Sequence, residues 1–83
     1  MVDLRTAYKV VCDKNNGAKP VAGLELERYY AFNVNPGIIN SATHLVDKKT
    51  GEYKMEHFIS IINEPVLEQY DERDFKRLKL WFN

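Results

Sequence analysis

Residues that favour turns divide this 83-residue chain into short segments. Proline lacks the amide hydrogen that helix interiors and central strands need, and glycine adopts backbone angles that other residues avoid. The clearest interruptions are Pro20 with Gly23, then 35–37 (Asn-Pro-Gly), 47–51 and 63–65 (Asn-Glu-Pro). The stretches between them are short and rich in β-forming residues, so the sequence predicts a mainly β domain.

Two strands are predicted in the first half of the chain. Residues 7–12 (Ala-Tyr-Lys-Val-Val-Cys) are rich in β-formers, and the turn residues of 13–17 follow them. We therefore expect a first strand at 7–12 and then a loop that extends to Leu24. Large apolar residues alternate with small or polar ones over 30–34, which predicts a second strand there.

A β-hairpin is predicted over residues 43–55. Its two β-rich arms flank 47–51, where a type I turn followed by Gly51 in the left-handed region would close the hairpin with a bulge. Residues 59–62 (Ile-Ser-Ile-Ile) are predicted to form a further short strand.

The tail of the chain favours a short helix over residues 72–80. Asp71 is placed to cap this helix, and Tyr70 with Phe75 would form a hydrophobic staple across its first turn. The apolar residues of 78–82 also alternate, which is typical of a strand, so both interpretations of that segment stay open.

Motifs across residues 7–62 follow one order: an apolar strand, a Leu-x-Leu-x-x-x-Tyr entry into the next strand, a hairpin, and an aromatic residue before a last strand. The residues that define this order are Leu24, Leu26, Tyr30, Asp47, Gly51 and Phe58. The order resembles a group of small uncharacterised phage and bacterial proteins with five-stranded SH3-like barrels. The resemblance implies such a barrel over 1–62, with 63–83 as a C-terminal extension that packs on the barrel or on a partner. It implies no activity, because a fold alone does not give a function.

Charge and segment length limit the classes of partner. The chain has 12 basic and 12 acidic residues, and a protein that coats nucleic acid without sequence preference needs an excess of cations. The N-terminus lacks an apolar stretch long enough for a signal or membrane segment. We therefore expect a cytoplasmic domain with no membrane partner.

The sequence offers no convincing catalytic constellation. Cys12 is the single cysteine, so a disulfide within the chain and a four-cysteine zinc site are both excluded. A nucleophile formed by Cys12 with His44 or His57 would need a base beside the thiol, but Cys12 ends an apolar run and is expected to be a buried structural thiol. We expect no enzyme activity, no metal and no cofactor.

Aromatic and apolar residues indicate a protein-interaction module of phage or mobile-element type. Tyrosines that cannot fit a small core would lie at the surface, and a dense apolar tail would either wrap around its own domain or contact another chain. The partner would be another protein or a second copy. The predicted contact residues are Tyr8, Tyr29, Leu80, Trp81 and Phe82.

The alternative is a small barrel that binds single-stranded nucleic acid. Such barrels stack bases on aromatic rings and use flanking cations for the phosphates. The cations available on the hairpin and the tail are Lys48, Lys49, Lys54, Lys76, Arg77 and Lys79.

Overall fold

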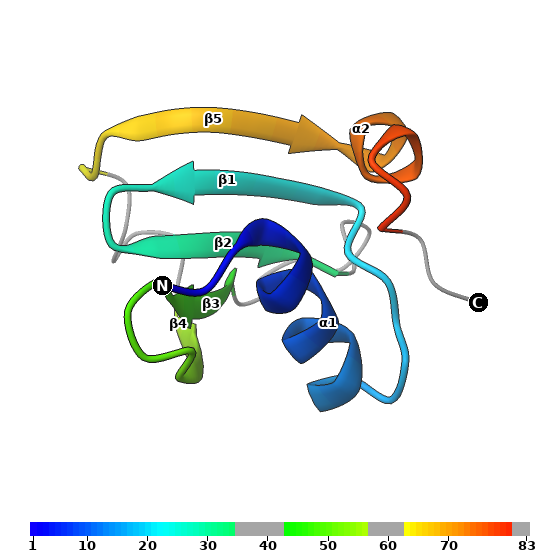
Figure 1. Ribbon diagram of the computed structural model, residues 1–83, viewed down its shortest axis with the longest axis horizontal. Helices are drawn as coiled ribbons and strands as arrows, with labels where there is room; N and C mark the ends of the chain where they lie inside the picture. Colours follow the sequence, from blue (N-terminus) through cyan, green and yellow to red (C-terminus); the bar gives the residue numbers. More distant parts are fainter. Residues whose placement is uncertain (35–42, 57–62, 81–83) are drawn as a thin grey trace.

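The computed structural model describes residues 1–34, 43–56 and 63–80. In these ranges the protein is a five-stranded antiparallel sheet with one helix on a face and a short helix at one end (Figure 1). The elements are α1 (Leu4–Lys14), β1 (Ala22–Leu26), β2 (Tyr29–Asn33), β3 (Thr43–Asp47), β4 (Tyr53–Glu56), β5 (Val66–Asp71) and α2 (Glu72–Arg77).

The mainly β prediction is confirmed, but the predicted barrel is not. The strand order is β4-β3-β2-β1-β5, and the sheet is open within the described ranges, with β4 and β5 at its two edges. Neither helix of these ranges has the length and apolar character that crossing a bilayer requires.

The first predicted strand is wrong, because residues 7–12 lie within α1. Asp3 caps this helix: its carboxylate accepts the amide hydrogen of Thr6 at 2.8 Å. The buried residues Ala7, Tyr8 and Val11 are spaced three and four apart, so the helix places them on one face against β2 and β3. Packing of this face outweighs the local β preference of the Val-Val pair.

The predicted loop to Leu24 is also wrong in its last part, because β1 begins at Ala22. The sequence predicts Gly23 as a residue that interrupts strands, but in the structure it lies in β1 and allows close packing. A Cβ atom on Gly23 would lie 3.0 Å from Cζ of Phe75 and 3.2 Å from the carbonyl oxygen of Ala31. Glycine therefore lets the Phe75 ring approach the strand backbone.

The hairpin prediction is confirmed by β3, β4 and the turn between them. Gly51 has φ of 77°, in the left-handed region, and its amide donates to the carbonyl oxygen of Asp47 at 2.8 Å. The carboxylate of Asp47 accepts from the amides of Lys49 (2.7 Å) and Thr50 (3.0 Å), which lowers the pKa of Asp47. The strand predicted at 59–62 lies outside the described residues.

The helix predicted over 72–80 is confirmed as α2, which ends at Arg77, and residues 78–80 form neither helix nor strand. Asp71 and Asp74 form a capping box, in which each side chain accepts from the amide of the other residue at 2.9 Å. The rings of Tyr70 and Phe75 stack with centroids 5.9 Å apart, as the staple predicted. The sequence did not predict β5, which comes from the segment assigned to the extension and pairs with β1 in the same sheet.

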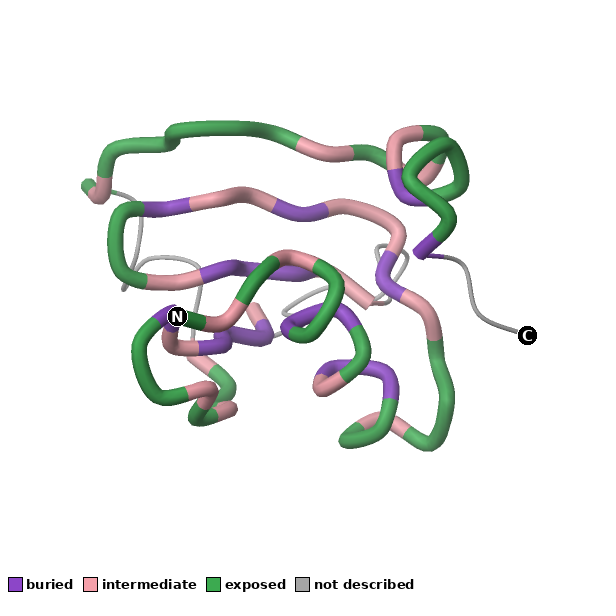
Figure 2. The backbone as a smooth tube through the Cα atoms, in the orientation of Figure 1, coloured by how far each residue is buried: buried purple, intermediate pink, exposed green. Residues whose placement is uncertain are grey.

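The main core lies between α1 and the sheet. Tyr8 of α1, Phe32 of β2 and Phe75 of α2 meet there, with ring centroids 5.1 to 6.1 Å apart. Buried segments concentrate on α1 and the central strands, whereas β5 is exposed along most of its length (Figure 2). The core thus ties both helices to one face of the sheet, and Leu26, Ala31 and Leu45 form a second, smaller buried cluster on the other face.

Candidate functional site

The face of the sheet opposite α1 carries an apolar row. Side chains of paired residues in neighbouring strands share a face, and successive residues alternate between faces. Phe32 packs against α1, so Ala31, next to it, lies on the opposite, outer face. Ala31 pairs with Leu24 of β1 and with Leu45 of β3, which therefore lie on the same face.

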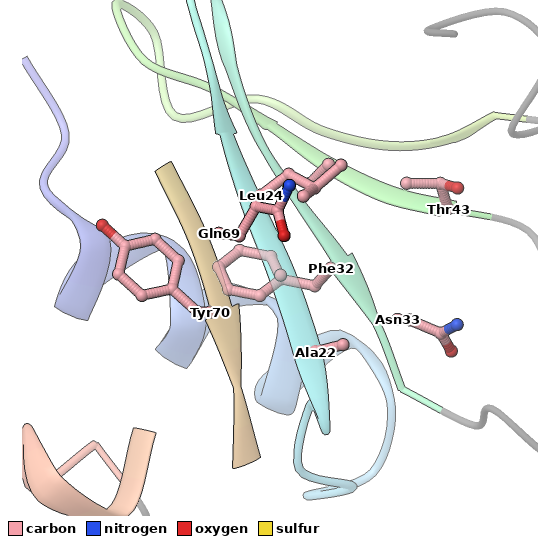
Figure 3. Close-up of a pocket in the computed structure, with 9 residues that line it drawn as sticks. Ala22, Leu24, Phe32, Asn33, Thr43, Gln69 and Tyr70 are labelled. Atoms are coloured by element: carbon pink, nitrogen blue, oxygen red, sulfur yellow. The ribbon is translucent and has the colours of Figure 1, made fainter. Parts of the chain in front are cut away.

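A hollow of about 270 Å³ opens over this row. Its lining comes mainly from outer-face residues of β1, β2, β3 and β5, and Figure 3 shows Leu24, Gln69, Thr43 and Asn33 around it. The complete lining is Ala22, Gly23, Leu24, Ala31, Phe32, Asn33, Thr43, Gln69 and Tyr70.

The chemistry of the hollow is that of a contact surface. Its floor is aliphatic, and the polar side chains that line it from the outer face are two amides, Asn33 and Gln69, and the hydroxyl of Thr43. These groups donate and accept hydrogen bonds, but they do not titrate near neutral pH. Within the described ranges, no group of three or more metal-ligating side chains is present. The hollow can hold an apolar group and hydrogen-bond a polar neighbour of that group.

Two of the predicted contact residues are buried in the protein's own core, so these predictions are wrong. Tyr8 has 0% of its surface exposed, because α1 directs it between Phe32 and Phe75, and this burial raises the pKa of its hydroxyl. Leu80 is 3% exposed and packs in the same core, held by its amide, which donates to the carbonyl oxygen of Phe75 at 2.9 Å. At Leu80 the tail therefore packs on its own domain. Trp81 and Phe82 lie outside the described residues.

Tyr29 lies on the outer face, next to Tyr30, which packs in the core on the α1 side. It is half-buried against the apolar cluster that includes Leu45, and cations lie over its ring: the guanidinium of Arg28 at 5.3 Å and Nζ of Lys54 at 5.0 Å from the centroid. A hydrogen bond with Tyr29 raises the pKa of Lys54. Tyr29 is therefore engaged within its own chain at the end of the face away from the hollow, and its contact with a partner stays a prediction.

The six cations predicted for nucleic-acid binding differ in their exposure and in their acidic neighbours. Lys48 is 6% exposed and its Nζ lies 2.6 Å from the carboxylate of Glu25, so the prediction that it contacts phosphate is wrong. A buried ammonium needs such a partner because desolvation is costly. Three others have acidic neighbours within 4 Å: Lys54 with Glu56, Lys76 with Glu72, and Arg77 with Asp74. Lys49 and Lys79 are exposed.

Cys12 and His44 are both buried on the α1 side of the sheet. Burial raises the pKa of the Cys12 thiol, as expected for a structural thiol and unfavourable for a nucleophile. Burial lowers the pKa of His44, whose Nδ1 lies 2.7 Å from the hydroxyl oxygen of Tyr53. His57 lies outside the described residues.

Sequence reasoning missed the hollow, since its lining comes from four strands and depends on their register. The alternation around Ala31 indicated an outward face, but β1 and β5 were not predicted. Searches with the sequence and the structure matched no protein-family model, no curated protein and no solved structure. The resemblance to small SH3-like phage and bacterial proteins therefore stays a prediction.

Proposed function

We propose that the protein is a non-enzymatic interaction module that binds another protein through the hollow on the outer face of its sheet. The hollow is the observation that carries this proposal. Small-molecule pockets span about 300–1,000 Å³, so a hollow of about 270 Å³ suits a single bulky side chain of a partner better than a whole cofactor. The phage or mobile-element origin implied by the resemblance is part of the same proposal.

The occupant that fits is an aliphatic or aromatic side chain on an extended segment. Leu24, which is half-buried, provides apolar contact above the buried Ala31 (2% exposed), and burial of one such side chain stabilises a complex by about 1.5–3 kcal/mol. Asn33 and Gln69 at the rim would pair with peptide groups on either side of that side chain. Such a contact is orientation-specific and needs no reacting group.

Two matched substitutions test the proposal. Peptides selected from a random displayed library against the natural protein would be titrated by calorimetry against Leu24→Glu and Leu67→Glu. Leu24 lines the hollow, whereas Leu67 of β5 is 57% exposed and does not line it. We expect Leu24→Glu to weaken binding at least about tenfold and Leu67→Glu to leave it unchanged. Equal loss in both folded variants, or no loss in either, would contradict the proposal.

One contact favours nucleic-acid binding as a second candidate. The guanidinium of Arg5 donates to the carbonyl oxygens of Leu78 (3.2 Å) and Lys79 (3.3 Å), which places a fourth cation beside the basic end of α2. If this surface binds single strands, affinity for an oligothymidine should fall steeply between low and moderate salt. Absence of binding at low salt would remove this candidate.

A further inference from the structure

The outer edge of β5 is a second place where another chain could meet this protein. β5 lies at the end of the sheet, and β1 is its only strand neighbour among the described residues. An edge strand presents backbone amides and carbonyls that another strand can pair with. Which amides point outward therefore decides whether this edge is open.

The hydrogen bonds between β2 and β3 show toward which neighbouring strand each residue of β2 directs its amide and carbonyl groups. The amide of Lys48 donates to the carbonyl oxygen of Arg28 at 2.9 Å, so Arg28 directs its backbone groups toward β3. Backbone groups alternate in direction along a strand. Tyr30 therefore also faces β3, and Ala31 directs its backbone groups toward β1.

The same alternation carries through β1 to β5. Leu24 pairs with Ala31 and faces β2, so Glu25, next to it, faces β5 and its partner Glu68. The β1–β5 register shifts between Glu25 and Leu26, so the regular alternation holds from Glu68 onward, where Gln69 and Asp71 stand one and three residues further along. Their amides consequently point away from the sheet.

Each of these two outward-pointing amides donates a hydrogen bond to a carboxylate of the same chain. The amide of Gln69 donates to Oε1 of Glu68 at 3.4 Å, and the amide of Asp71 donates to Oδ2 of Asp74 at 2.9 Å. An incoming strand would have to displace both acceptors and place its carbonyl oxygens beside two negative charges. Edge strands of natural proteins are commonly protected by charged side chains in this way.

We propose that the β5 edge is a latent pairing site for a second copy of this chain, which Glu68 and Asp74 keep closed. A second copy fits because antiparallel pairing of two β5 strands centred on Gln69 sets Glu68 opposite Tyr70, so no like charges face each other across the pair. Exposed Val66 and Leu67 on the same strand add apolar surface to this contact. The inference is independent of the hollow, because it needs no ligand there.

Removal of the two carboxylates tests the proposal. The variant Glu68→Thr/Asp74→Ala should form dimers that light scattering detects at concentrations where the natural protein shows no such change in mass. Hydrogen exchange at the Gln69 amide should slow by at least about tenfold in those dimers. Glu68→Thr alone keeps the cap of α2 and should show weaker association, which covers the case that the double variant does not fold.

Two controls separate edge pairing from a general effect of charge. Glu27→Thr/Asp13→Ala removes the same charge at exposed positions outside β5 and should behave as the natural protein. Proline has no amide hydrogen to donate to an incoming strand, so adding Gln69→Pro to the double variant should restore the mass of the natural protein. Proline is tolerated at this position because the outward-pointing amide of Gln69 makes no hydrogen bond to β1. Unchanged mass in both Glu68 variants, equal association of the charge control, or no rescue by proline would overturn the proposal.

Discussion

At the scale of single residues, glycine and histidine show how the core constrains chemistry. Gly23 leaves room for the Phe75 ring against β1, and burial on the α1 side of the sheet lowers the pKa of His44. Asn15 donates to the hydroxyl oxygen of Tyr53 at 3.4 Å, and the same oxygen lies 2.7 Å from Nδ1 of His44. Packing on the α1 side of the sheet therefore constrains both Gly23 and His44.

Substitution of Gly23 should destabilise the fold. A valine there would place side-chain atoms within about 3 Å of the Phe75 ring, and overpacking of this kind costs about 1–3 kcal/mol. Urea unfolding of Gly23→Val would measure the loss. Gly17→Ala serves as a control, because no atom lies within 4 Å of its new methyl group and the cost comes only from its φ of 83°. A Gly23→Val protein as stable as the natural one would contradict this account of the packing.

His44 should make the fold less stable in mild acid. Because burial lowers its pKa from 6.5, the unfolded chain binds a proton at a higher pH than the folded chain does. The free energy of unfolding should therefore fall as the pH decreases below about 6.5, and stop falling on this account once the folded ring is also protonated. His44→Gln keeps a side chain that can hydrogen-bond to Tyr53 but cannot titrate. If the free energy of unfolding changes equally between pH 7 and pH 5 in the natural protein and in His44→Gln, the lowered pKa of His44 is contradicted.

At the scale of elements, local signals predicted the hairpin and α2 correctly, and tertiary packing determined the rest. Gly51 and the Asp71 cap act within a few residues of sequence, so they are visible without a structure. Residues 7–12 carry strand-forming valines, yet Asp3 and the spacing of the buried face make them helical. β5 escaped prediction because an exposed edge strand lacks alternating polarity.

The cap of α2 should contribute measurably to stability. Asp71→Ala removes the acceptor for the Asp74 amide, and loss of such a cap costs about 0.5–2 kcal/mol. Asp71→Asn keeps a side-chain oxygen and should lose less. Chemical denaturation of the two variants compares them, and an asparagine variant that loses as much as the alanine variant would speak against a capping role.

At the scale of the whole molecule, the segment after residue 62 is part of the sheet and the core. It supplies β5, the buried ring of Phe75 and the buried Leu80. The hollow also depends on it, because Gln69 and Tyr70 line one side. This dependence on long-range register explains why the sequence indicated an outward face near Tyr29 but not the site itself.

A chain truncated after residue 62 should therefore fail to fold. It would lose β5, one of the two strands that pair with β1, and leave Tyr8 without the Phe75 ring 5.1 Å away. Far-ultraviolet circular dichroism during urea unfolding should show no cooperative transition. A cooperative transition in residues 1–62 would mean that those residues form an independent domain.

The central claim, that the hollow accepts one apolar side chain, is tested most directly by nuclear magnetic resonance. The labelled full chain would be titrated with N-acetyl-leucinamide and N-acetyl-tryptophanamide as side-chain probes, with N-acetyl-glutamate amide as the charged control. We predict saturable shifts of the amides of Leu24, Ala31, Thr43 and Gln69 with the apolar probes and none with the charged one. Shifts confined to other surfaces, or equal shifts with all three probes, would contradict the claim.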